Sequence, residues 1–303
     1  MKRLLAVDWG TSSLRGALLD SHGKVLEERS LERGILTVPP GDFATVFEAS
    51  FPDWARAHGT FCLISGMAGS KQGWLEAPYC PCPAGFDDVA SQLAWVKAGR
   101  IAIVPGLSCE HDGVPDVMRG EEIQVFGALQ LLALKDALLV LPGTHSKWVT
   151  AAAGRITGFS TFMTGEFYAL LHQHSILARS MPEDSGPVGD DVDWTAFDQG
   201  VALALRSPSL LQTAFSVRTL SLFSRMTPAS LPAYLSGLVI GEEIRTQQLA
   251  HGTEVVLVGS EVLTQRYERA LAQCGAKVQC VGAEATWRGL WALTQTIHPH
   301  WDV

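Results

Sequence analysis

The amino-acid sequence predicts an α/β fold built from two related halves. Apolar runs of strand length alternate with longer amphipathic segments along the whole chain, which is typical of α/β proteins. A strand, a turn rich in Gly, Thr and Ser, and a returning strand occur near residue 10 and again near residue 143. Such a repeat indicates internal duplication. With 303 residues, 47% of them hydrophobic, the chain can fill two sizeable cores.

The expected elements follow from these patterns. Short apolar runs bounded by turn residues predict strands at 3–8, 14–20, 24–30, 61–65, 101–104, 137–141, 147–152, 156–159 and 255–258. Amphipathic segments predict helices at 43–57, 87–96, 121–134, 165–178, 193–206, 208–224, 228–247, 261–273 and 284–297. The stretch 180–187, rich in Pro, Ser and acidic residues, predicts an exposed loop.

The repeat also suggests where the domains lie. Each half opens with three strands in hairpin order, and the second half carries a helical insert at about residues 165–250. We therefore expect one domain at 1–135 and another at 136–303, with the last helix able to pack back on the first domain. Helices of the insert alternate apolar and polar residues, which suits either core packing or contact in a homodimer.

Charge and composition argue against several classes of protein. A formal net charge of −8 does not favour a broad nucleic-acid surface. We expect neither a secretory leader nor a membrane span, because Lys2 and Arg3 precede only a short apolar run and the run 129–141 contains two charges. The six cysteines have no zinc or disulfide spacing. These features predict a cytoplasmic protein with reduced thiols.

The first turn, residues 8–13, has the chemistry of a phosphate site. Gly10 allows the backbone to approach an anion closely. Asp8 stands at the end of a strand, where its carboxylate can hold a hydrated Mg²⁺. Hydroxyl and amide donors suited to phosphate oxygens follow at Thr11, Ser12 and Ser13. A carboxylate beside such a cradle predicts ATP handling.

The second turn offers a similar set of groups. Gly143 and Thr144 follow the apolar run 138–141, and a returning strand comes after them. We expect Thr11, Ser12 and Thr144 to donate to the β- and γ-phosphates, with both turns facing one cleft. His145 is either a ligand of phosphate or substrate oxygen, or a histidine held in the turn by backbone bonds.

Five sequence blocks resemble the 2-dehydro-3-deoxygalactonokinase family, a short branch of the sugar kinase, hsp70 and actin superfamily. They lie at 8–13, 66–70, 117–122, 141–148 and 161–166. The turn after 255–258, with Gly259 and Ser260, is similar to the adenosine-binding turn of that superfamily. The resemblance implies two ribonuclease H-like domains with an interdomain cleft, and ATP and Mg²⁺ as cofactors. It also implies transfer of the γ-phosphoryl group to 2-dehydro-3-deoxy-D-galactonate, giving the 6-phosphate in galactonate breakdown.

This chain departs from the superfamily pattern at two places. Leu141-Pro142 stands where most members have an acid at the second turn, and Ser260 follows Gly259 where paired glycines are usual. Asp8 is therefore the only turn acid well placed for metal.

The resemblance also implies a catalytic base. In carbohydrate kinases of this superfamily a carboxylate at a helix start accepts the proton of the substrate hydroxyl, and helix dipoles keep such an acid ionised. We favour Glu121 for this role, with Glu122 or Asp116 as alternatives. Acids at a helix N-terminus also occur for stability alone.

A carboxylate substrate requires cations and a shaped pocket. Candidates for substrate binding are Trp9, Arg15, Gly69, Ser70, Arg119 and Lys147. Each cation has a solvated-surface alternative, and Trp9 has the alternative of core packing. Thr164 and Glu166 resemble a helix-capping pair more than a site.

Two other functions share this fold. A sugar-responsive regulator would carry a DNA-binding helix-turn-helix before the first turn, and we expect none because Asp8 lies so near the start. An ATPase or polyphosphate hydrolase of the superfamily would use water as nucleophile, so its turnover would not depend on a sugar acceptor. Another sugar or sugar acid remains an alternative substrate, because the residues do not distinguish one 2-keto-3-deoxy acid from its epimer.

Overall fold

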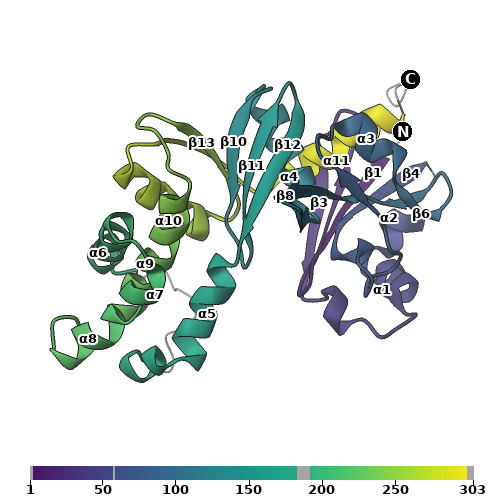
Figure 1. The fold of residues 1–303 in the computed structure, drawn as a ribbon. Coiled ribbons are helices and arrows are strands. Elements are labelled where there is room, and N and C mark those ends of the chain that lie inside the picture. Colours follow the sequence, from purple (N-terminus) through teal and green to yellow (C-terminus); the bar gives the residue numbers. More distant parts are fainter. Residues whose placement is uncertain (1–2, 57–58, 183–191, 299–303) are drawn as a thin grey trace. The chain divides into compact units, whose positions relative to one another are not determined.

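The computed structural model describes residues 3–56, 59–182 and 192–298, and its elements follow the expected alternation of strands and helices (Figure 1). Most of the predicted loop at 180–187 lies outside the described residues, and its first two residues, Ser180 and Met181, are buried. Helices of the N-terminal part are α1 (Phe43–Ser50), α2 (Pro52–Arg56), α3 (Phe86–Ser91) and α4 (Glu121–Leu132). The later helices are α5 (Thr164–His174), α6 (Trp194–Arg206), α7 (Leu210–Thr213), α8 (Ser216–Leu222), α9 (Leu231–Thr246), α10 (Glu261–Gln273) and α11 (Glu284–Ile297).

The first sheet has six strands in the order β3-β2-β1-β4-β7-β6. They are β1 (Arg3–Trp9), β2 (Leu14–Leu19), β3 (Val25–Leu31), β4 (Thr60–Gly66), β6 (Ala94–Lys97) and β7 (Ile101–Ile103). The β1–β2 and β2–β3 pairs are antiparallel, whereas β1–β4 and β4–β7 are parallel. The carboxyl ends of β1 and β4 therefore meet at one edge of the sheet, where open α/β sheets bind ligands.

The second sheet repeats this arrangement. Its order is β12-β11-β10-β13-β14, with strands β10 (Ala137–Leu141), β11 (Ser146–Ala152), β12 (Arg155–Phe162), β13 (Glu254–Val258) and β14 (Lys277–Val281). In both sheets the first strand of the half has its hairpin partners on one side and two parallel strands on the other, and the first sheet adds the antiparallel edge strand β6. This shared order confirms the predicted duplication and the two-domain α/β fold. A small third sheet contains β5 (Tyr79–Pro81), β8 (Gly106–His111) and β9 (Val114–Met118).

The residues fall into two compact units that are interleaved along the chain. Unit 1 contains Met1–Ala137, Val149–Ser160 and Ala283–Val303, and unit 2 contains Leu138–Trp148 and Thr161–Gly282. Within unit 1, α11 packs closely on α4, because a Cβ added at Gly127 would lie 1.8 Å from the carbonyl oxygen of Ala285. The domain boundary expected near residue 135 stays a prediction.

Several details of the expected elements are wrong. The second half of the helix expected at 87–96 is instead strand β6, an antiparallel edge strand paired with β7. The helices expected at 43–57, 165–178 and 208–224 are each divided into shorter pieces; Pro52, for example, opens α2 where the first of them was to continue. Strands β5, β8, β9 and β14 were not expected. In β5, β9 and β14 exposed residues outnumber buried ones, whereas β8 is buried at its start and exposed at its end.

Candidate active site

The first turn joins β1 and β2 and leaves its donors facing solvent. The Gly10 amide donates to the Ser13 carbonyl at 2.9 Å, which closes the turn, and Thr11 and Ser12 are exposed. The segment that contains Ile35 and Leu36 holds this turn in place, because the amides of these two residues donate to the carbonyls of Gly10 and Thr11. The carbonyls of Gly10, Thr11 and Ser13 are thus occupied, and exposed hydroxyls able to donate hydrogen bonds remain for a ligand. This polarity suits an anion.

Asp8 lies near the carboxyl end of β1, just before this turn. Its carboxylate is ion-paired with Arg15 on β2, and its side chain is only 17% exposed. A Cβ added at Gly66, at the end of β4, would lie 3.2 Å from an Asp8 carboxylate oxygen, and one at Gly120 would lie 3.3 Å from the Cα of Gly66. The ends of β1 and β4 and the start of α4 therefore converge on Asp8. Gly66 and Gly120 also have positive φ angles, which favour glycine.

The two acids at the start of α4 have different environments. Glu121 is half-buried, and one of its carboxylate oxygens accepts the backbone N–H of Arg119 at 3.0 Å. Glu122 is fully buried and accepts the N–H of Gly120 at 2.7 Å, while its other oxygen has no partner among the described residues. Burial, together with the neighbouring Glu121 charge, raises the pKa of Glu122 to about 8. Glu122 is therefore mainly protonated at neutral pH and closed off from a ligand, which leaves Glu121 as the accessible acid of the pair.

The buried Glu122 predicts a pH-dependent stability. Its pKa is higher in the folded state than in the unfolded state, so the folded state binds more protons between about pH 4.5 and 8. The free energy of unfolding should therefore fall as pH rises through this window. Glu122 contributes at most about 1.4 kcal/mol per pH unit to this fall. Chemical denaturation from pH 5.5 to 8 should show that the Glu122→Gln variant lacks this loss. If the free energies of unfolding of wild type and variant differ by the same amount at every pH, the raised pKa of Glu122 is refuted.

Arg119 lies beside the same edge of the sheet, with its guanidinium turned inward. It donates to the carbonyl of Ala77 at 2.8 Å and lies 4.3 Å from the centre of the Tyr79 ring. Its Nε and Nη1 are buried and have no partner in the described part of the chain. A Cβ added at Gly69 would lie 2.7 Å from Nη1, so Gly69 packs closely against this guanidinium. Buried donors of a cation are costly to leave unused unless a ligand supplies acceptors.

The other candidates of this unit have different surroundings. The Ser70 hydroxyl is buried and lacks a partner among the residues that the structure describes. Asp116 is on β9, and its carboxylate accepts the N–H of Val117. Trp9 is fully buried, packs its ring against Phe43 and Trp74 and donates to a backbone carbonyl. The expectation that Trp9 walls the sugar site is therefore wrong, because an enclosed ring in the core cannot contact a ligand.

The second turn lies in unit 2, between β10 and β11. Thr144 and His145 are exposed, and the carbonyl of Thr144 accepts the N–H of Glu166 at 3.0 Å. The His145 ring contacts the Glu166 carboxylate at 2.5 Å. Helix α5 starts against this turn, because a Cβ added at Gly165 would lie 2.5 Å from the carbonyl oxygen of Gly143. The position of the turn therefore depends on the start of α5.

Two expectations about this region need correction. Thr164 and Glu166 do not cap α5, because Glu166 contacts His145 and the Thr164 hydroxyl donates to a carboxylate on α9. Lys147 is buried in β11, and its Nζ donates to the Thr161 hydroxyl at 2.9 Å. Because the ammonium group of Lys147 is buried and bonded within the sheet, Lys147 does not offer a free cation to a substrate.

Glu243, a buried residue of α9, connects the turn to the core. Its carboxylate accepts hydrogen bonds from the Ser146 hydroxyl at 2.8 Å, the Trp148 indole at 2.6 Å, the Tyr267 hydroxyl at 2.7 Å and the Thr164 hydroxyl. Burial raises the pKa of Glu243, whereas the four donors favour its ionised form. Through these hydrogen bonds, α9 is connected to β11, α5 and α10. Nothing in the sequence around Glu243 identifies it as a hub.

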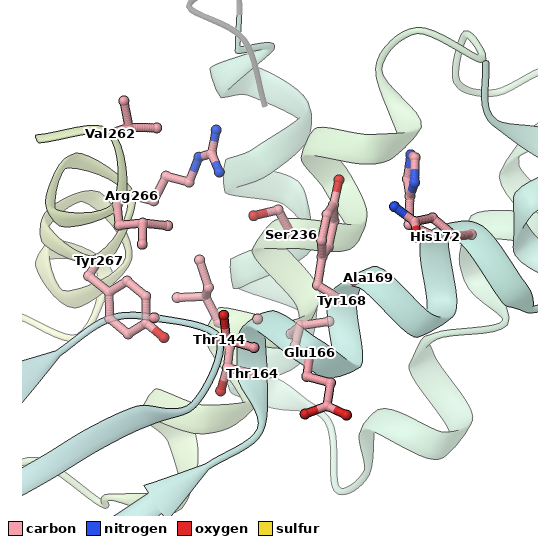
Figure 2. Close-up of a pocket in the computed structure, with 16 residues that line it drawn as sticks. Thr144, Thr164, Glu166, Tyr168, Ala169, His172, Ser236, Val262, Arg266 and Tyr267 are labelled. Atoms are coloured by element: carbon pink, nitrogen blue, oxygen red, sulfur yellow. The ribbon is translucent and has the colours of Figure 1, made fainter. Parts of the chain in front are cut away.

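A pocket opens from the second turn into the helices of unit 2 (Figure 2). Its volume is about 480 Å³, within the range of small-molecule sites. Gly143 and Thr144 line it together with residues of α5, α9 and the first turns of α10. The turn before α10 is close by, because a Cβ added at Gly259 would lie 3.8 Å from Pro142. The structure therefore brings Gly259 close to the second turn, whereas Ser260 is exposed at the start of α10 and neither residue lines the pocket.

Comparison with known proteins identifies the family. The profile described as 2-keto-3-deoxy-galactonokinase matches residues 8–293, nearly the whole chain. The chain belongs to the 2-keto-3-deoxy-galactonokinase family. It is 36% identical to the 2-dehydro-3-deoxygalactonokinase of Escherichia coli (strain K12) over 94% of this chain and 95% of that protein. It is also 38% identical to a protein of Rhizobium meliloti (strain 1021) that carries the same name as a probable assignment, over 97% of both chains.

Solved structures agree with this family membership. The chain matches a crystal structure from Sinorhizobium meliloti with a TM-score of 0.89 and 36% identity. That protein is described as a candidate 2-dehydro-3-deoxygalactonokinase. The alignment covers 99% of this chain and 100% of that one. Component A of the Acidaminococcus fermentans (R)-2-hydroxyglutaryl-CoA dehydratase matches with a TM-score of 0.54 at 12% identity, covering 100% of both chains. That second likeness shows the shared fold alone.

The structure places the candidate residues of this galactonokinase-family chain in two groups. In unit 1, Asp8, Arg15, Gly69, Arg119 and Glu121 surround the converging ends of β1, β4 and α4. In unit 2, the second turn and Gly259 lie near one pocket, whereas Ser260 is exposed at the start of α10. Among the described residues no cluster of three or more His, Cys, Asp or Glu could hold a metal ion, and no helix has the length and apolar character to cross a membrane.

Proposed function

We propose that this chain transfers the γ-phosphoryl group of ATP to the terminal hydroxyl of 2-dehydro-3-deoxy-D-galactonate. The product is the 6-phosphate, an intermediate of galactonate breakdown. The observation that carries the proposal is the family match over residues 8–293, joined by 36–38% identity to relatives of that name. The donor-rich turns, the half-buried Glu121 and the inward-facing Arg119 supply groups that such a reaction needs.

ATP is assigned to the two turns and to the pocket of unit 2. The exposed donors of residues 10–13 and of Gly143 and Thr144 bind the phosphates, and the pocket receives the nucleoside. Mg²⁺ needs few protein ligands, because phosphate and water oxygens complete its shell. Asp8 supports it, so no larger acidic cluster is required. When bound, this cation neutralises charge that develops on the transferred phosphoryl group.

The sugar acid is assigned to the edge of the sheet in unit 1. Unused N–H groups of Arg119 donate to the substrate carboxylate or keto oxygen, and the buried Ser70 hydroxyl contributes a further polar contact. Arg15, which is paired with Asp8 at the same edge of the sheet, supplies a further cation. Glu121 accepts the proton of the attacking hydroxyl. We place the reaction in the cytoplasm, in keeping with the six free cysteines of the structure.

A panel of sugar acids tests this proposal directly. The purified protein is incubated with ATP, Mg²⁺ and one acid at a time, including 2-dehydro-3-deoxy-D-galactonate and its gluconate epimer, and the products are analysed by mass spectrometry. The expected product is the galactonate derivative phosphorylated at the terminal carbon. ATP consumption that is the same with and without an acceptor would instead identify a hydrolase.

The close packing of Gly165 predicts a strong effect on nucleotide use. In the Gly165→Ala variant the new methyl group would meet the backbone of Gly143 and Thr144, so the turn has to move. Small displacements of positioning groups can cost about 100-fold in rate, and we expect a loss of this order in kcat/KM for ATP. Gly158→Ala is the matched control, because nothing lies within 4 Å of its added Cβ. Wild-type ATP kinetics in Gly165→Ala would exclude the second turn from the phosphate site.

A further inference from the structure

Arg266 is a buried cation with two nitrogens that make no hydrogen bond to the described residues. It lies on α10, lines the unit 2 pocket and is only 3% exposed. Its Nε and Nη2 are buried, and neither has a partner among residues 3–56, 59–182 and 192–298. These two nitrogens form one edge of the guanidinium, with parallel N–H groups that match a pair of adjacent acceptors. Because a desolvated guanidinium without acceptors destabilises a fold, this edge indicates a ligand.

A second unsatisfied polar group faces the same part of the pocket. The hydroxyl of Tyr168, on α5, is buried and has no partner in the described residues. Each of these two side chains lies in the electrostatic field of the other. In Figure 2 the guanidinium of Arg266 and the hydroxyls of Tyr168 and Ser236 lie toward one end of the pocket, and Thr144 lies at the other. The donors of Arg266 and the hydroxyls of Tyr168 and Ser236 therefore lie at the end of the pocket that is away from the second turn.

The chemistry of ATP identifies what this end of the pocket can bind, on the basis of the function proposed above. With phosphates at Gly143 and Thr144, the nucleoside extends along the pocket toward Arg266. In adenine every ring acceptor adjoins an amino group or a C–H, so the base has no pair of adjacent acceptors. The 2′,3′-diol of the ribose does have such a pair, and its hydroxyls also need acceptors, which Tyr168 and Ser236 can supply.

We propose that Arg266, together with Tyr168, binds the ribose diol of ATP and makes the protein select ribonucleotides over 2′-deoxyribonucleotides. In this arrangement Nε and Nη2 donate to the two diol oxygens. The Tyr168 oxygen accepts one diol hydroxyl hydrogen. Arg266 is then a residue that determines specificity for the phosphate donor, distinct from the groups that contact the transferred phosphoryl.

Calorimetric titration with ATP and with 2′-deoxy-ATP, in the absence of sugar acid, tests this assignment. Wild type should bind 2′-deoxy-ATP about 10-fold more weakly than ATP. Arg266→Met should weaken ATP binding about 10- to 100-fold, as expected for loss of charge-assisted hydrogen bonds. The difference between the two nucleotides should then shrink to less than about 3-fold. Tyr168→Phe should reduce the discrimination partly.

The matched control lies one turn further along the same helix. Arg269 forms an ion pair with the exposed Asp198, so Arg269→Met removes a guanidinium from α10 without touching the pocket. Its nucleotide affinities should equal those of wild type. If Arg266→Met does not fold, Arg266→Lys keeps the charge but loses the paired donors, and it should lose discrimination in the same way.

Thermal melting without nucleotide separates a binding role from a structural one. Removal of an unpaired buried charge should leave Arg266→Met at least as stable as wild type. Equal weakening of both nucleotides, or unchanged affinity for both, would overturn the proposal. A wild-type protein that discriminates between the nucleotides but phosphorylates no sugar acid would disprove the proposed function and leave this inference standing.

Discussion

Replacing Asp8 with asparagine should abolish phosphoryl transfer while the protein stays folded. The substitution keeps the shape of the side chain but removes the charge that pairs with Arg15 and that supports the metal in the proposed function. Stabilisation by a metal ion in phosphoryl transfer contributes several kcal/mol, so we expect kcat/KM to fall by about 1,000-fold or more. Coupled kinase assays at several Mg²⁺ concentrations measure the loss.

A second aspartate of the same hairpin provides the control. Asp20 stands at the other end of β2, and its carboxylate accepts the backbone N–H groups of His22 and Lys24 in an exposed turn. Asp20→Asn should leave turnover unchanged and lower stability by about 1 kcal/mol at most. If Asp8→Asn retains turnover with an intact fold, then Asp8 does not support the metal.

The Glu121→Gln variant should show the second-largest effect. A positioned general base contributes about 10²- to 10⁴-fold to rate, so kcat should fall by that factor while KM for ATP changes little. The amide of glutamine can still accept the N–H of Arg119, which preserves the start of α4. Steady-state kinetics with the sugar acid and with ATP separate the two parameters.

Variants of the neighbouring acids decide between the alternatives for the base. Glu122 is buried and has a raised pKa, and Asp116 holds the N–H of Val117 on β9. Glu122→Gln and Asp116→Asn should therefore keep most of the rate. A large loss of kcat in Asp116→Asn, with Glu121→Gln active, would reassign the base to β9.

The duplicated fold could be predicted because its signals are local. In β1 and β2, apolar runs bound a turn that contains Gly10, and the same combination recurs at β10 and β11. The hairpin of β8 and β9 was missed although Asp112 and Gly113, both with positive φ, form its two-residue turn. That dipeptide is a strong hairpin signal between strands. Strand β14 was missed because most of its residues are exposed at the edge of a sheet.

Much of the site depended on contacts between residues that are distant in sequence. Glu243 lies 97 residues from Ser146, and a single acid inside a helix gives no local sign of four hydrogen bonds. The guanidinium of Arg266 is significant only because its Nε and Nη2 have no partner in the described part of the chain. For the same reason, sequence could not show that Lys147 is held by Thr161 or that Trp9 is enclosed by aromatic rings.

The proposed kinase function requires that the turns at residues 10–13 and 143–145 both bind the phosphates of ATP. Amide hydrogen exchange, with and without a non-hydrolysable ATP analogue and Mg²⁺, measures this for each turn separately. We predict that nucleotide slows exchange in both turns. Protection confined to one turn, with the other exchanging as in the free protein, would contradict the account.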